Sequence, residues 1–122
     1  VAYGAHSGDH AIYPDCRPEF IEKMREIAKI VDYKPLELLT PYQNITKADI
    51  VRIGLELNVN FSLTWTCYIG GSKPCGRCGS CVERTGAFVL SNSKDPLYTD
   101  EEWQKAVEYA NEQERLYKLN KK

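Results

Sequence analysis

Apolar residues recur every three or four positions in three stretches of the chain, and this spacing predicts amphipathic helices. The first stretch covers residues 18–32, the second 47–57 and the third 100–118. Charged residues occupy the opposite side of each, so we expect each helix to pack along one face only. The apolar positions are Phe20, Ile21, Met24, Ile27, Ala28 and Val31 in the first, Ile50, Ile53, Gly54 and Leu57 in the second, and Trp103, Ala106, Val107, Ala110 and Tyr117 in the third.

Residues that favour helix starts precede or open all three stretches. Pro18 suits a first helical turn, where its missing N–H is not needed. Thr46 and Asp49 have the spacing of a capping box, as do Thr99 and Glu102. These signals support the three predicted helix starts.

Strand signals are few. Residues 36–39 (Leu-Glu-Leu-Leu) predict a short, largely buried strand, and 61–66 predict a strand or an extended loop. Residues 82–90 could be helical, and 95–98 predict a turn. The order helix, strand, loop, helix indicates part of an α/β layer. Because such sheets normally have four or more strands, we expect this chain to be the second half of a larger domain.

Composition and charge narrow the function classes. The chain has 122 residues, of which 43% are hydrophobic and 27% are charged, as in a soluble globular domain. A formal net charge of −1 provides no broad positive field for nucleic acid or anionic lipid. No apolar run approaches the ~20 residues that span a bilayer, and the first residues lack signal-peptide features. We therefore expect a soluble, cytoplasmic protein with no nucleic-acid or membrane partner.

Four of the five cysteines fall within fifteen residues, which indicates a metal site. Four thiolates satisfy the tetrahedral preference of Zn²⁺ and leave no open position, as in structural sites. An iron–sulfur cluster is the main alternative, although the Cys-Pro that continues the bacterial ferredoxin pattern is missing. Disulfide bonds or unliganded thiols are the remaining alternative. The cluster comprises Cys67, Cys75, Cys78 and Cys81, and the basic residues that could offset its charge are Lys73, Arg77 and Arg84.

Ionisable residues also gather in a glycine-containing loop over residues 4–17. His6, Asp9 and His10 could be metal ligands or acid–base groups, or they could be ordinary solvated loop residues. Cys16 is expected to be a small buried residue rather than a nucleophile, because no histidine partner can be assigned to it. Lys47 opens a predicted helix, where the helix dipole disfavours a cation. It could face an anion such as a phosphate, or it could be an ordinary solvent-facing lysine.

Three blocks of this sequence resemble the 7-cyano-7-deazaguanine synthase family, whose members make the precursor of queuosine and archaeosine. The first block is Tyr13–Phe20, and the second is Thr40–Pro41 followed by Lys47–Ala48. The third is Leu63–Tyr68, which leads into the segment Cys75–Cys81. The blocks occur in the family's order over about residues 1–90.

The resemblance implies a Rossmann-like, adenine nucleotide alpha hydrolase-like fold of the ATP-pyrophosphatase type. It implies a ligase that uses ATP and Mg²⁺ to activate 7-carboxy-7-deazaguanine, which ammonia and a second dehydration convert to the nitrile. It also implies a homodimer and a zinc ion bound by the four clustered cysteines. By position, it implies that Lys47, near the phosphates, and Asp15 are catalytic, and that the substrate is lined by Gly4, Asp9, Tyr13 and Arg17.

The family's Ser-Gly-Gly-x-Asp-Ser phosphate loop has no match here, so we expect only the C-terminal portion of such an enzyme. In this interpretation residues 1–60 complete the Rossmann-like domain, 61–92 bind zinc, and 93–122 form a helical tail. Without its N-terminal half, the chain alone is expected to be inactive. The alternative hypothesis is a non-catalytic zinc module that binds a protein or RNA partner.

Overall fold

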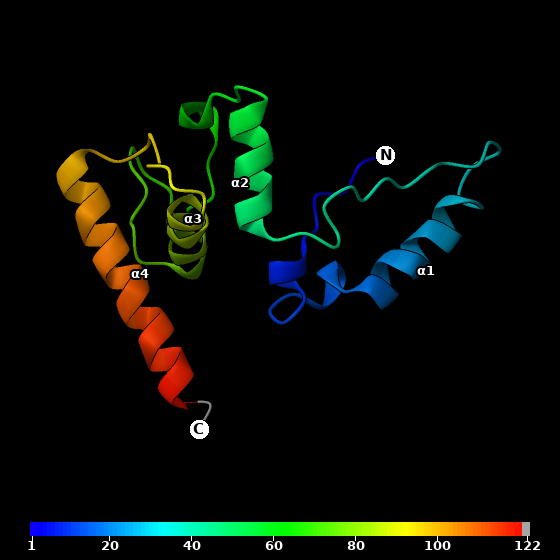
Figure 1. Cartoon of the computed structure of the whole chain (residues 1–122). Coiled ribbons are helices and arrows are strands. Elements are labelled where there is room, and N and C mark those ends of the chain that lie inside the picture. The colour runs from blue at the N-terminus through cyan, green and yellow to red at the C-terminus, as the bar shows by residue number, and fades with distance from the viewer. Residues whose placement is uncertain (121–122) are drawn as a thin grey trace. The chain divides into compact units, whose positions relative to one another are not determined.

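The computed structural model describes residues 1–120, which form helices joined by loops (Figure 1). The chain folds as two compact units, Val1–Ile50 and Val51–Lys122, the second described as far as residue 120. No helix within residues 1–120 combines the length and apolar character needed to cross a bilayer. The helices are α1 (Pro18–Ala28), α2 (Lys47–Glu56), α3 (Gly79–Leu90) and α4 (Asp100–Asn120), with short 3-10 turns η1 (Ser7–Asp9), η2 (Pro14–Cys16) and η3 (Phe61–Leu63).

The first unit has a small core at the junction of its N-terminal loop and α1. Ala5, Cys16 and Ile21 are buried together, and Tyr3 packs against them. The Tyr3 hydroxyl lies 3.6 Å from the Cys16 sulfur, and this hydrogen bond, with burial, raises the pKa of Tyr3 to about 12. Cys16 is therefore a small buried residue, as the sequence predicts.

The predicted strand at residues 36–39 is wrong. The structure has only an isolated parallel bridge between Ala2 and Leu39. Its hydrogen bonds run from the Tyr3 amide to the Leu39 carbonyl (2.9 Å) and from the Leu39 amide to the Val1 carbonyl (2.8 Å). A parallel strand is stabilised by neighbours along its length, and within residues 1–120 this segment pairs at one position only. The predicted α/β layer is therefore not seen within residues 1–120, which contain helices and this one bridge but no strand.

Helix α1 is shorter than predicted and more exposed. It ends at Ala28 rather than near residue 32, where the chain turns and the Leu36 amide donates to the Ala28 carbonyl (3.0 Å). Of its predicted apolar face only Ile21 is fully buried, while Phe20 and Ile27 remain 40% and 49% exposed. Periodicity located the helix, but what covers its face depends on tertiary contacts.

Both predicted capping boxes are confirmed. Before α2, the Thr46 amide donates to the Asp49 carboxylate (2.8 Å), and the Asp49 amide donates to the Thr46 hydroxyl (3.2 Å). Before α4, the Thr99 amide donates to Glu102 (2.8 Å), and the Glu102 amide donates to the Thr99 hydroxyl (3.3 Å). Each box satisfies two amides at a helix start, so these boundaries follow from local sequence.

The second unit is built on the packing of α3 against α4. Phe88 of α3 is buried and meets Phe61 edge to face, with ring centroids 5.2 Å apart. Phe61 belongs to η3, so the 61–66 segment starts as a 3-10 turn and continues as an extended loop, not as a strand. On α4, Ala106 and Ala110 are the buried residues that face inward.

The buried side of α2 is rotated from the predicted one. Val51 and Gly54 are buried, whereas Ile53 is 36% exposed and Leu57 lies beyond the helix end and is 71% exposed. Gly54 leaves space for the Phe61 ring, which is why a small residue stands on this face. A Cβ at position 54 would lie 2.4 Å from the tip of that ring.

This close approach predicts that Gly54→Ala destabilises the chain. The Phe61 ring would have to move against Phe88, and overpacking of this kind costs about 1–3 kcal/mol. Chemical denaturation of the full chain measures the loss.

Gly86→Ala is the matched control, because Gly86 also lies within a helix and a Cβ there meets nothing within 4 Å. The control should be neutral or more stable by up to about 1 kcal/mol. Equal stability of the two variants would contradict the packing described here.

Candidate metal centre

The four clustered cysteines come from three local structures of the second unit. Cys67 ends the extended segment that follows η3, and Cys75 lies in a loop. Cys78 is the N-cap of α3, and Cys81 lies in its first turn. Helix α3 begins at Gly79, three residues before the predicted start, so the last two ligands sit at a helix N-terminus that favours thiolates.

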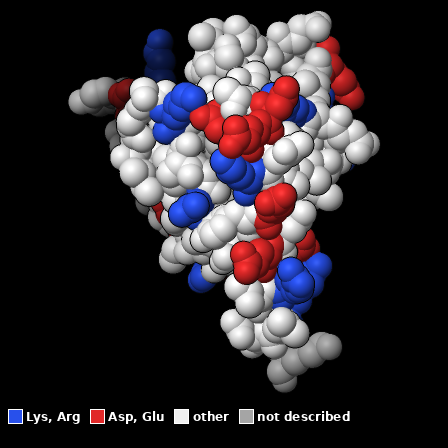
Figure 2. Space-filling view, turned by 90° about the vertical axis from the view of Figure 1, so that its left-hand side faces the viewer, with Lys and Arg blue, Asp and Glu red and all other residues white. Residues whose placement is uncertain are grey.

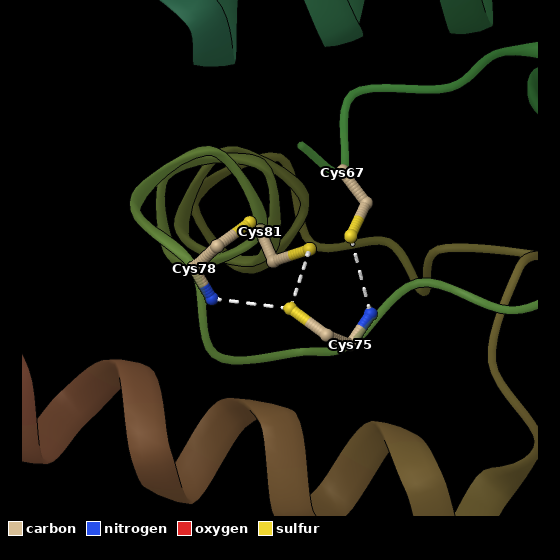
Figure 3. Close-up of side chains that lie close together, drawn as sticks. All are labelled: Cys67, Cys75, Cys78 and Cys81. Carbon is tan, nitrogen blue, oxygen red and sulfur yellow. Dashed lines mark hydrogen bonds between the residues drawn. The ribbon is translucent and has the colours of Figure 1, made fainter. Parts of the chain in front are cut away.

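The sulfur atoms of these cysteines gather at one point. All four lie within 4.8 Å of one another, and their side chains point toward a common space (Figure 3). The Cys75 and Cys81 sulfurs are 3.8 Å apart, nearly twice the ~2.05 Å of a disulfide bond. All four are free thiols, so the prediction that the cluster could hold a metal ion is met by the geometry.

Backbone amides of the same loop donate to the sulfurs. The Cys75 amide donates to Cys67 (3.4 Å), and the amides of Arg77 and Cys78 donate to Cys75 (3.4 and 3.2 Å). The first of these bonds is the main reason why the pKa of Cys67 falls to about 6. Gly76 has φ +70°, the left-handed conformation that lets the loop turn and aim its amides inward.

The two cysteines at the start of α3 differ in how readily they ionise. Burial, followed by the hydrogen bond with Cys78, raises the pKa of Cys81 to about 12. Burial also opposes ionisation of Cys78, but amide donors including that of Cys81 bring its pKa below the usual value. A cation that displaces the proton of Cys81 would restore a thiolate in this buried position. The donor set and its spacing therefore fit a thiolate-bound metal.

An ion pair buried beside the cluster fixes the segments around it. Arg84 and Asp95 are 5% and 0% exposed, and the Arg84 Nη2 atom donates to the Asp95 carboxylate at 2.9 Å. Arg84 also donates to the Thr64 hydroxyl (2.9 Å) and the Phe61 carbonyl (3.3 Å). These contacts tie the segment before Cys67 and the turn after α3 to the helix that carries Cys81.

The three basic residues expected to offset the charge of the cluster have other partners. Arg84 pairs with Asp95, and Lys73 pairs with Glu102 of α4 at 2.6 Å. Arg77 lies over the Tyr109 ring, 5.9 Å from its centroid. Lys73 and Arg77 thus connect the loop 73–77 (the metal loop) to α4, whereas Arg84 connects α3 to the turn that follows it.

The comparisons with known proteins bear on this site and on the first unit. The profile of the family described as "Queuosine biosynthesis protein QueC" matches residues 1–92. The chain belongs to this family. The match includes all four clustered cysteines and the loop 4–17, and it ends before α4. Family membership implies an adenine nucleotide alpha hydrolase-like fold, of which the described residues contribute the cysteine cluster and a helical tail.

Two curated relatives of the chain carry the same name. The chain is 55% identical over 97 residues to the "7-cyano-7-deazaguanine synthase" of Pseudoalteromonas translucida, covering 80% of this chain and 44% of the relative. It is 59% identical over 95 residues to the protein of that name from Caldicellulosiruptor bescii, covering 78% and 43%. The chain thus spans less than half the length of these relatives. No solved structure matches it.

The first unit carries the residues that the resemblance assigns to substrate and phosphates. Asp9 lies 3.1 Å from His6, whose other ring nitrogen accepts from the Gly8 amide (3.2 Å). Arg17 donates to the His10 carbonyl (3.0 Å). The Tyr13 amide donates to the Asp9 carbonyl (2.8 Å), which folds the loop back on itself. The His6 and Asp9 side chains therefore contact each other within this loop.

The remaining assigned residues of this unit lie at its surface or at a helix start. Gly4, Tyr13 and Asp15 are exposed, and Arg17 is half-buried. Lys47 is the first residue of α2, as the capping box predicts. The roles of these residues in substrate binding and catalysis stay predictions.

The Arg84–Asp95 pair generates a stability prediction. Asp95→Ala leaves a buried guanidinium without its counter-charge, which should cost about 3–5 kcal/mol. Glu101→Ala removes the Lys105–Glu101 pair, whose side chains are 71% and 78% exposed, and should change the free energy of unfolding far less, because water screens this pair.

Urea denaturation of the full chain measures both variants under one set of conditions. If Asp95→Ala were no more costly than Glu101→Ala, the buried pair would not have the role described.

Proposed function

We propose that Cys67, Cys75, Cys78 and Cys81 bind one Zn²⁺ as a structural site. The edge of a tetrahedron with ~2.3 Å Zn–S bonds is about 3.8 Å, and the Cys75 and Cys81 sulfurs are separated by 3.8 Å. Four protein ligands close the coordination sphere, so the ion would hold the loop and α3 together without contacting a substrate.

A single iron ion or an iron–sulfur cluster is the competing occupant. In a cluster the thiolates bind different iron atoms, so the sulfurs stand farther apart than around one ion, whereas here all lie within 4.8 Å. This spacing favours a single ion. A colourless purified protein with zinc supports the proposal, and a coloured protein with iron would overturn it.

Metal content should therefore depend on the cluster and not on the fifth cysteine. Cys75→Ser should reduce zinc well below one equivalent per chain, because a ligand that also accepts two amide hydrogen bonds is lost. Cys16→Ser should retain one equivalent, because Cys16 lies in the core of the first unit.

Elemental analysis of the wild type and the two variants tests this prediction, with X-ray absorption to count sulfur neighbours. Absence of stoichiometric zinc from the wild type, or equal zinc in both variants, would contradict it.

We propose further that the full-length protein containing this chain is a 7-cyano-7-deazaguanine synthase. The observation that carries this proposal is the family match over residues 1–92, which includes the loop 4–17 and the four cysteines. The relatives bear that name and are more than twice the length of the matched segment. In the proposed reaction ATP activates the carboxylate of 7-carboxy-7-deazaguanine by transferring a phosphoryl or adenylyl group to its oxygen. Ammonia then attacks the carboxyl carbon, the activated oxygen leaves with that group, and an amide forms. A second ATP-driven loss of water gives the nitrile.

The first unit would contribute positive charge and hydrogen bonds to this reaction. Lys47 stands at the N-terminus of α2, where the helix dipole favours an anion, and we assign it to the ATP phosphates. Asp15 is the second proposed catalytic residue. The loop residues Gly4, Asp9, Tyr13 and Arg17 are the proposed substrate contacts, with Mg²⁺ as the counter-ion of ATP. We propose that the enzyme works as a cytoplasmic homodimer.

The same proposal predicts that the chain alone is inactive, since it lacks a match to the phosphate loop of the family. Joined to the N-terminal half of a relative and supplied with ATP, Mg²⁺, ammonia and the deazaguanine acid, it should form nitrile together with AMP or ADP. Failure of the zinc-loaded assembly to form nitrile would overturn the assignment.

Lys47→Met in that assembly should lower kcat by about 10²–10³-fold if Lys47 neutralises developing phosphate charge. Lys29→Met is the control, because Lys29 is the exposed C-cap of α1, and it should leave kcat unchanged. Equal kcat values for the two variants would exclude Lys47 from the phosphate site.

The alternative, a zinc module that binds RNA, requires a positive surface. Figure 2 shows basic and acidic groups interspersed on the face that it presents. With a net charge of −1, this pattern favours the enzyme over RNA binding.

A further inference from the structure

Tyr98 occupies a fixed place in the turn between α3 and α4. The Asp95 carboxylate accepts from the Leu97 amide (3.1 Å), and the Asp95 carbonyl accepts from the Tyr98 amide (3.3 Å). Asp95 is itself held by Arg84. The Tyr98 ring packs near Trp103, with centroids 6.1 Å apart, and the residue is only 6% exposed. Tyr98 is thus held on one side through Asp95 and on the other by Trp103.

The hydroxyl of Tyr98 is buried and forms no hydrogen bond of ordinary geometry within residues 1–120. A buried hydroxyl without an acceptor is destabilising, so its place in the structure calls for an explanation. A phenol is protonated at neutral pH and is therefore available as a donor.

The surroundings of this hydroxyl belong to the metal loop. A Cβ built on Gly76 would lie 3.9 Å from the Tyr98 oxygen and 3.8 Å from the ring, so the ring lies directly against the loop. The Tyr98 hydroxyl also interacts with the Cys81 side chain. Cys81 is 0% exposed, so its sulfur is not reached by solvent.

Four thiolates around one divalent ion carry a net charge of −2, and hydrogen bonds to the sulfurs disperse it. Cys67 and Cys75 receive backbone amides at 3.2–3.4 Å. Cys81 is fully buried, so a neutral side-chain donor would stabilise its thiolate without bringing a charge of its own into the site.

We propose that Tyr98 donates an O–H···S hydrogen bond to the Cys81 thiolate of the metal-loaded site and is a positioning residue for that ligand. The inference rests on the proposed metal site. Tyr98 lies beyond residues 1–92, the part of the chain that the family profile matches. The turn after α3 therefore adds a group from outside the matched segment to the metal centre.

Tyr98→Phe removes only the hydroxyl and keeps the ring. Partners of metal ligands typically contribute 10- to 100-fold in affinity, so the Kd for Zn²⁺ in a chelator competition should rise about 10- to 100-fold. In the Co²⁺-loaded variant, the sulfur-to-cobalt charge-transfer band should move to lower energy, because the Cys81 thiolate loses a hydrogen bond and holds its electrons less tightly. The band intensity should still correspond to four thiolates.

Tyr109→Phe is the control, because Tyr109 reaches the same loop through its ring, over which Arg77 lies. Its Kd and cobalt spectrum should match those of the wild type. Wild-type values for Tyr98→Phe would overturn the inference and leave the metal site intact. A wild-type chain that binds neither Zn²⁺ nor Co²⁺ would overturn both.

A measurement on the wild type covers the case in which Tyr98→Phe does not fold. In the ¹¹³Cd-loaded protein, the Tyr98 hydroxyl proton should exchange slowly with solvent and show coupling to cadmium across the O–H···S–Cd bridge. A rapidly exchanging, uncoupled hydroxyl proton in a cadmium-loaded protein would overturn the inference.

Discussion

The second unit depends on one buried charge that cannot be neutralised. A guanidinium keeps its proton inside a protein, so Arg84 has to be surrounded by acceptors. Asp95 supplies two of them from beyond the end of α3, and Thr64 and Phe61 supply others from the segment before Cys67. Satisfying this single side chain brings together three segments that are distant in sequence, and two of them lead to metal ligands.

The sulfur cluster adds a second constraint that acts over a shorter range. Three of its cysteines come from seven consecutive residues, and the loop between them supplies amides for the sulfurs. Cys67 comes from the segment that Arg84 holds. Four thiolates crowded within 4.8 Å of one another would repel each other, whereas one shared cation would stabilise them.

Helix α4 lies outside the matched family segment, yet it contacts the metal loop closely. Glu102 pairs with Lys73, Tyr109 meets Arg77, and Ala106 lies against Gly76. With the turn that carries Tyr98, this helix covers one side of the loop 73–77. Helix α4 is therefore an integral part of the second unit. An ion bound by the cysteines would stabilise the contact between α4 and the loop 73–77.

Local rules predicted where the helices lie, both capping boxes and the clustering of the four cysteines, because each depends mainly on neighbours within a few residues. The prediction of a strand at residues 36–39 was wrong, because strand formation depends on partners far along the chain. The early start of α3 was also not predicted, because its first residues Gly79 and Ser80 are weak helix formers. The pairing of Arg84 with Asp95 and the burial of Tyr98 beside Cys81 have no local signature. They arise only when α3, the turn and the metal loop pack together, since burial, not sequence spacing, decides which acceptor a charged or polar side chain finds.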